Sequence, residues 1–109
     1  MSTQVNYSMY ENEIKFAEKY DEVACALDQL KKKKYLMVKE LYKIVDNCLE
    51  EKITWKSFEQ CVKGMILEGL VVETFSNDQK FIMGLSPIGK DVHQALIKKK
   101  NKHLVTVHY

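Results

Sequence analysis

The chain has 109 residues, a formal net charge of +2 and 46% hydrophobic residues, which suits one domain with one hydrophobic core. No apolar run approaches the roughly 18 residues that a membrane-spanning helix needs, and residues 1–4 lack the basic and apolar segments of a secretion signal. We therefore expect a cytoplasmic domain with no membrane partner, and the small net charge does not by itself indicate nucleic-acid binding.

The basic residues are all lysines, 17 in number, and there is no arginine. They cluster at residues 31–34 and again at residues 98–100 with Lys102. Lysine binds phosphate as a point charge but lacks the fork with which arginine binds guanine. Each cluster is therefore either a phosphate-binding surface or a solvated helix end favoured by the helix dipole.

The first predicted element is a long helix over residues 9–33, preceded by a disordered segment, residues 1–8. Ser8 and Glu11 have the spacing of a capping box. One apolar stripe recurs at intervals of three and four residues: Ile14, Ala17, Tyr20, Ala24, Leu27 and Leu30. The helix is longer than a small core requires, so it either forms a dimer surface or cradles the last helix.

A short strand at residues 35–37 and a helix at residues 39–50 come next. The inward side of this helix is predicted to carry Leu41, Ile44, Val45, Cys48 and Leu49. Val38 cannot act as an N-cap, so the start of the helix is not defined by a cap. Thr54 is a good N-cap for the following helix, residues 55–68.

The helix at residues 55–68 has two distinct faces when drawn at about 100° per residue. Its core face carries Phe58, Cys61, Val62, Met65 and Ile66, with Trp55 at the edge. Its opposite face carries Lys56, Gln60, Lys63 and Leu67, flanked by Glu59 and Gly64. A glycine inside a helix costs about 1 kcal/mol relative to alanine, so Gly64 indicates a close approach by another group.

Residues 69–89 form the most informative stretch. Gly69 suits the left-handed position that ends a helix, and two β-rich segments, residues 70–75 and 80–85, flank a turn at residues 76–79. Ser86 and Pro87 are an N-cap and a first helical residue, which begin a helix at residues 87–100. The tail at residues 101–109 is interpreted as frayed or loosely docked; a strand is the alternative.

A helix ending in Glu-Gly-Leu-Val, a hairpin and a helix opening with Leu-Ser-Pro-x-Gly together resemble the wing of a winged helix-turn-helix domain. The resemblance is to small MarR-like and PadR-like regulators, including those of archaeal viruses, and it covers residues 9–100. It implies an α+β, mostly helical fold in the order helix, strand, helix, helix, strand, strand, helix. It also implies a viral or prokaryotic transcriptional regulator that binds double-stranded DNA sequence-specifically. The protein would be a homodimer, joined through its first and last helices, on a pseudo-palindromic site.

In such a domain the helix at residues 55–68 enters the major groove. The resemblance therefore places DNA contacts on this helix and the hairpin tip: Thr54, Lys56, Ser57, Glu59, Gln60, Lys63, Asn77 and Lys80. Glutamine can bind adenine, and lysine can bind guanine or phosphate. Glu59, the outward Leu67 and the missing arginines favour the alternative, a winged-helix protein-interaction module without DNA binding.

The sequence contains no pattern for catalysis, a cofactor or a metal. His93, His103 and His108 have no cysteine or carboxylate at metal-ligand spacing, and His93 is expected to form a surface pair with Asp91. Three cysteines at apolar positions are expected to be reduced and buried: Cys25, Cys48 and Cys61. We therefore expect a protein that is not an enzyme, with no cofactor and no metal.

Overall fold

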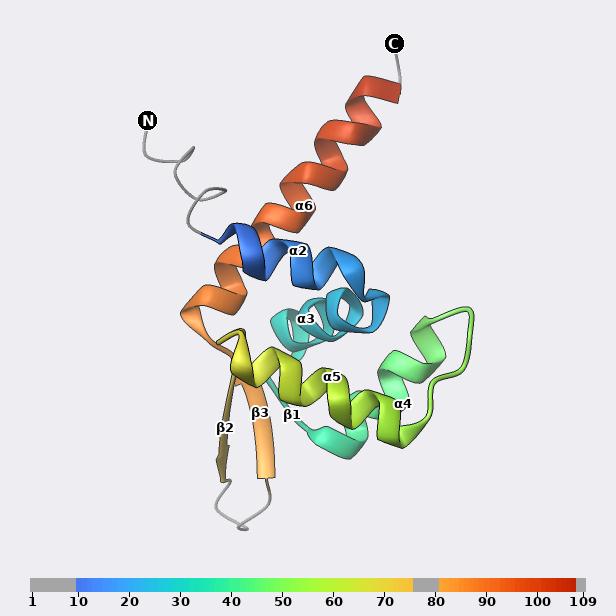
Figure 1. Cartoon of the computed structure of the whole chain (residues 1–109), viewed down its shortest axis with the longest axis vertical. Helices are drawn as coiled ribbons and strands as arrows, with labels where there is room; N and C mark the ends of the chain where they lie inside the picture. The colour runs from blue at the N-terminus through green and yellow to red at the C-terminus, as the bar shows by residue number, and fades with distance from the viewer. Residues whose placement is uncertain (1–9, 76–80, 108–109) are drawn as a thin grey trace.

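The computed structural model describes residues 10–75 and 81–107. The fold is α+β and mostly helical, as predicted, with a small antiparallel sheet at one side of a helical body (Figure 1). The elements are α2 (Glu11–Lys19), α3 (Asp21–Lys33), β1 (Tyr35–Met37), α4 (Val38–Cys48), α5 (Trp55–Leu67), β2 (Val71–Phe75), β3 (Phe81–Leu85) and α6 (Pro87–Val107).

The prediction of one helix over residues 9–33 is wrong, because the helix is interrupted at Tyr20. Tyr20 has an extended backbone, with φ −121° and ψ 112°, and it both ends α2 and precedes α3. Its carbonyl accepts the N–H groups of Val23 and Ala24, which starts α3. The first helix begins at Glu11 after Tyr10, which makes no side-chain cap; Ser8 and the predicted disordered segment lie outside the described residues.

The core lies between α3, α5 and the inner face of the sheet. Its largest fully buried side chains include Leu27 and Leu30 from α3, Phe58 and Met65 from α5, and Met83 from β3. The predicted stripe of the first helix therefore faces the centre of the domain.

Helix α4 starts one residue earlier than predicted and uses a different cap. The Met37 N–H donates to Oε1 of Glu40 at 3.2 Å, which is the half of a capping box in which a glutamate of the first turn binds the N–H of the N-cap residue. Leu41 and Val45 are buried as predicted. The placement of Cys48 on the inward side is wrong, because Cys48 is exposed.

The sheet has the order β1-β3-β2, and both pairs are antiparallel. Tyr35–Met37 forms the predicted first strand and pairs with the second strand of the hairpin. Gly84 lies opposite Tyr35 on one side and Val72 on the other. The predicted turn at residues 76–79 lies outside the described residues.

The junction between α5, β2 and α6 confirms the predicted caps. Gly69 has φ 74°, and the N–H groups of Gly69 and Leu70 donate to the carbonyls of Ile66 and Met65, which is the Schellman arrangement. The Ser86 hydroxyl donates to the Gly69 carbonyl and accepts the Gly89 N–H. The end of one helix is therefore hydrogen-bonded to the start of another.

Helix α6 continues to Val107, so the predicted end at Lys100 and the alternative of a strand in residues 101–107 are wrong. Its N-terminal part, up to Lys99, packs beside α2 and α3, and its C-terminal end projects away from the body of the domain (Figure 1). The Lys99 ammonium lies 2.6 Å from the Glu18 carboxylate of α2. Helices α2 and α3 thus cradle the last helix, α6.

The described part of the chain contains no helix with the length and apolar character of a membrane span.

Candidate nucleic-acid interface

The outer face of α5, defined here as Lys56, Glu59, Gln60, Lys63 and Leu67, is exposed along its whole length. The core face is buried at Phe58, Val62 and Met65. The sequence therefore predicted both faces, except that Ile66 is 38% exposed instead of buried.

The start of α5 is held in two ways. The Thr54 hydroxyl accepts the Ser57 N–H at 3.1 Å, so Thr54 is the predicted N-cap. Behind this turn the Tyr42 ring lies 5.3 Å from the Trp55 ring and 5.4 Å from the Phe58 ring, centroid to centroid. Aromatic pairs at these distances stabilise a contact beyond simple burial, so α5 is firmly oriented relative to α4.

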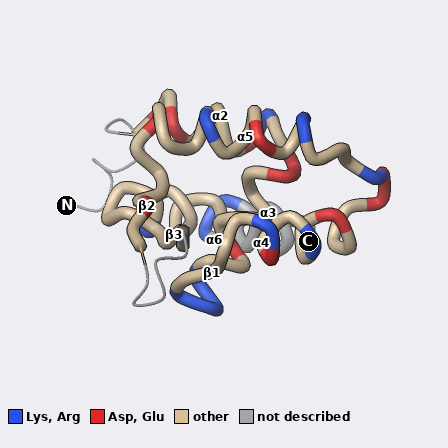
Figure 2. Tube along the Cα trace, turned by 90° about the horizontal axis from the view of Figure 1, so that it is seen from below, with Lys and Arg blue, Asp and Glu red and all other residues tan. Residues whose placement is uncertain are grey.

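Ion pairs distinguish the lysines of the outer face from other lysines of the chain. Within the described part of the chain, Lys56 and Lys63 form no ion pair, whereas four other lysines do: Lys15, Lys32, Lys52 and Lys99. Glu59 lies between them in sequence, and Figure 2 shows basic and acidic residues interspersed along α5. Figure 2 also shows a continuous basic segment at the turn before β1, away from α5.

The Phe16 side chain of α2 contacts one flank of α5, and Gly64 allows this approach. A Cβ atom at Gly64 would lie 2.6 Å from Cζ of Phe16, which is closer than van der Waals contact permits. A groove of about 300 Å³ opens beside this contact, lined by Phe16, Tyr20, Glu22, Ser57, Gln60 and Cys61. Ser57 and Gln60 therefore border α2, while Lys56 and Lys63 lie on the open side.

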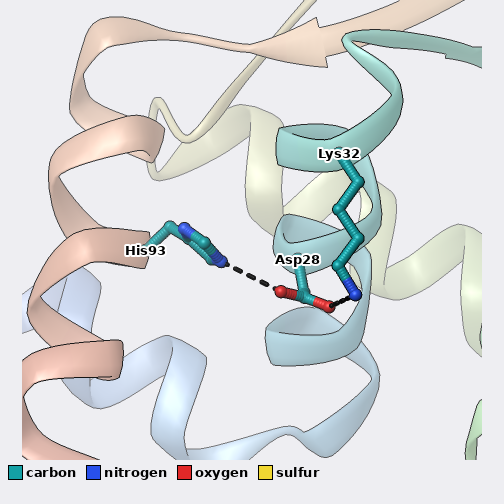
Figure 3. Close-up of polar contacts among 3 residues, drawn as sticks. All are labelled: Asp28, Lys32 and His93. Atoms are coloured by element: carbon teal, nitrogen blue, oxygen red, sulfur yellow. Dashed lines mark hydrogen bonds and ion pairs between the residues drawn. The ribbon is translucent and has the colours of Figure 1, made fainter.

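His93 is buried in the interface between α6 and α3, so its predicted surface pairing with Asp91 is wrong. His93 Nε2 lies 3.3 Å from Asp28 Oδ1, and Lys32 Nζ lies 3.1 Å from Asp28 Oδ2 (Figure 3). Asp91 instead accepts the Tyr10 hydroxyl at 3.3 Å.

The Asp28 carboxylate is stabilised by this chain of contacts. Burial raises the pKa of Asp28, but the hydrogen bonds from Lys32 and His93 outweigh burial and hold the pKa below its ordinary value. Asp28 is thus a charged link between α3 and α6. One signal in the sequence would have placed His93 inward. His93 shares one side of α6 with Gly89, Val92 and Leu96, at the intervals of three and four residues that mark the buried side of a helix.

The three cysteines are free, as predicted, but they are not fully buried: Cys25 and Cys61 are partly buried and Cys48 is exposed. Burial raises the pKa of the Cys25 thiol to about 12 and that of the Cys61 thiol to about 11. Because the thiolate is the reactive form of cysteine, neither is activated at neutral pH. Within the described residues no group of three histidine, cysteine or carboxylate side chains could hold a metal.

Of the predicted DNA contacts, the structure places Lys56, Glu59, Gln60 and Lys63 on one exposed face, with Thr54 and Ser57 at its start. Asn77 and Lys80 lie outside the described residues. No family model, curated protein or solved structure matches the chain.

Proposed function

We propose that the chain is a winged helix-turn-helix protein that binds double-stranded DNA as a transcriptional regulator. In this proposal α4 and α5 are the helix-turn-helix, and the β2–β3 hairpin is the wing. The element order supports it, since β1 precedes α4 and pairs with the hairpin strand β3.

The observation that carries the proposal is the outer face of α5. Lys56, Gln60 and Lys63 are exposed at a spacing that places them on one side of the helix, and the two lysines have no ion-pair partner in the described part of the chain. The major groove admits an α-helix whose outer side chains reach base edges. Gln60 would read a base, and Lys56 and Lys63 would contact phosphate or guanine.

The proposal includes a homodimer. The part of α6 that projects beyond the body of the domain would pair with the same helix of a second copy, because α6 up to Lys99 is already in contact with α3, α2 and the residue before α2. Two copies of α5 would then address half-sites roughly 34 Å apart. Light scattering of the full chain checks this state: a strictly monomeric mass at binding concentrations contradicts it.

A binding titration tests the DNA proposal. Fluorescence anisotropy with a labelled random duplex and an AT-rich duplex, at several salt concentrations, gives affinity and salt slope. Changing Lys56→Ala and Lys63→Ala together should weaken binding and reduce the salt slope by about 0.9 for each phosphate contact removed. The matched control, Lys33→Ala with Lys98→Ala, removes two exposed lysines away from α5 and should keep most of the affinity. Equal loss in both double variants contradicts the assignment to α5.

The alternative is a winged-helix module that binds another protein. Leu67, at the end of the outer face, is 85% exposed, and Glu59 would repel phosphate. A folded chain that binds neither duplex at low salt would favour this function over DNA binding.

A further inference from the structure

A second basic site lies away from α5. A cavity of about 410 Å³ opens where the end of α3, β1, the end of β3 and the first turn of α6 meet. Cavities of this size accommodate small molecules. The lining residues are Leu30, Lys31, Lys34, Tyr35, Leu85 and Lys90, and we refer to them as the lysine pocket. None of them belongs to α5, so the pocket is separate from the proposed DNA surface.

The three lysines of the pocket give it a positive charge. Lys31, Lys34 and Lys90 form no ion pair with any described residue. The acidic residues nearest to them along the helices are already engaged, since Asp28 binds Lys32 and His93 and Asp91 accepts the Tyr10 hydroxyl. An anion entering the pocket would therefore meet three lysines without displacing a carboxylate.

The helix dipoles account for only part of this arrangement. Lysines in the last turn of α3 are favoured by the negative end of that helix. Lys90 is in the first turn of α6, where the dipole is positive and a cation is disfavoured, and that turn carries no acidic residue. Lys90 and the start of a 21-residue helix therefore add to the positive potential of the pocket.

Lys34 has an unusual backbone conformation at the mouth of the pocket. Its φ is 70° and its ψ is −59°, the rare γ-turn conformation, and such a strained backbone costs a residue with a Cβ atom about 1 to 3 kcal/mol. The Lys34 N–H donates to the Leu30 carbonyl at 2.9 Å, which holds the turn in place. Glycine would fit this turn without the cost.

Tyr35 provides a flat apolar surface beside the lysines. Its ring lies over Gly84, where a Cβ atom would be 2.6 Å from Cε1 of Tyr35, yet the residue remains 57% exposed. Leu30 and Leu85 supply the apolar lining near it. Planar rings stack on exposed aromatic side chains at binding sites for nucleobases.

We propose that the lysine pocket binds a small phosphate-bearing molecule with a planar ring, of the nucleotide class. Lys31, Lys34 and Lys90 hold the phosphates, and Tyr35 stacks on the base. This is a small-ligand site in addition to the proposed DNA surface, and it does not depend on that surface.

Isothermal titration calorimetry of the full chain with ATP and with pyrophosphate tests the proposal. Changing Lys31→Gln and Lys90→Gln together should weaken ATP binding about tenfold per lysine, the usual worth of a hydrogen bond to a charged group. The control pair Lys43→Gln and Lys98→Gln, exposed lysines outside the pocket, should leave ATP binding unchanged. Tyr35→Ser should weaken ATP but not pyrophosphate.

Four results would overturn the proposal. Three of them are the absence of saturable ATP binding, equal losses in the two lysine pairs, and ATP binding that Tyr35→Ser leaves unchanged. The fourth is a loss of affinity for duplex DNA, with ATP binding unchanged, in the Lys31→Gln and Lys90→Gln variant, which would make the pocket a DNA-backbone contact. Lys90→Gln alone repeats the test if the double variant does not fold, as judged by circular dichroism.

Discussion

Two regions of α5, its junction with the hairpin and its outer face, are built in opposite ways. At the junction, defined as Gly69, Leu70, Ser86 and Gly89, the polar groups bind one another and the backbones are in contact. On the outer face the lysines are exposed and, within the described residues, have no ion-pair partner. The difference teaches that the residues that orient α5 are not those that are available to a ligand. Substitutions in the two regions should therefore separate stability from binding.

Gly89→Ala should have the largest effect on stability. The added Cβ atom would lie 1.9 Å from the Leu70 carbonyl oxygen and 3.0 Å from its carbon, so β2 or α6 has to move. Overpacking against backbone is expected to cost about 3 kcal/mol or more. Urea unfolding followed by circular dichroism measures it, and an unchanged midpoint would show that the junction can relax.

Ser86→Ala removes the hydroxyl that joins Gly69 to Gly89. Losing an N-cap and leaving a carbonyl without its donor should cost about 2 kcal/mol. The control is Ser57→Ala, which removes an exposed hydroxyl but keeps the backbone N–H that Thr54 caps. Equal midpoints for the two variants in urea would contradict the role given to Ser86.

Thr54→Ala tests the cap at the other end of α5. The loss should be about 1 kcal/mol, the usual value for an N-cap, because the cap is exposed and water can replace it. Thr54→Ser keeps the accepting oxygen and should recover most of the stability. If serine is no better than alanine, the hydrogen bond to Ser57 does not contribute.

Lys56→Gln with Lys63→Gln should have the smallest effect on stability, within about 0.5 kcal/mol, as is usual for exposed positions. The same pair is expected to lower DNA affinity. Thermal unfolding of the double variant checks the first point. A loss as large as that of Thr54→Ala would mean that the outer face takes part in the fold.

Local features of this chain could be predicted from its sequence. The glycine end of α5, the caps at Thr54 and Ser86 and the two faces of α5 each depend on residues within one or two turns of each other. The strand at residues 35–37 was also predicted from a short β-rich segment, and its pairing with β3 is confirmed.

Features that join distant residues could not be predicted. The interruption between helices α2 and α3 at Tyr20 is not marked by a glycine or a proline, and the apolar stripe continues across it. Phe16, in α2, contacts Gly64, which is 48 positions away in the sequence. Asp28 and His93 are 65 positions apart. The lysine pocket unites residues 30–35 with Leu85 and Lys90, so its shape depends on the packing of α6 against α3.

The aromatic cluster at the start of α5 also gives the protein an optical reporter. Trp55 is the only tryptophan in the chain, it is partly buried, and Tyr42 and Phe58 pack around it. Its emission senses both the packing of α4 on α5 and events at the neighbouring outer face. The pocket around Tyr35 contains no tryptophan, so ligand binding at the two surfaces can be distinguished by intrinsic fluorescence without a label.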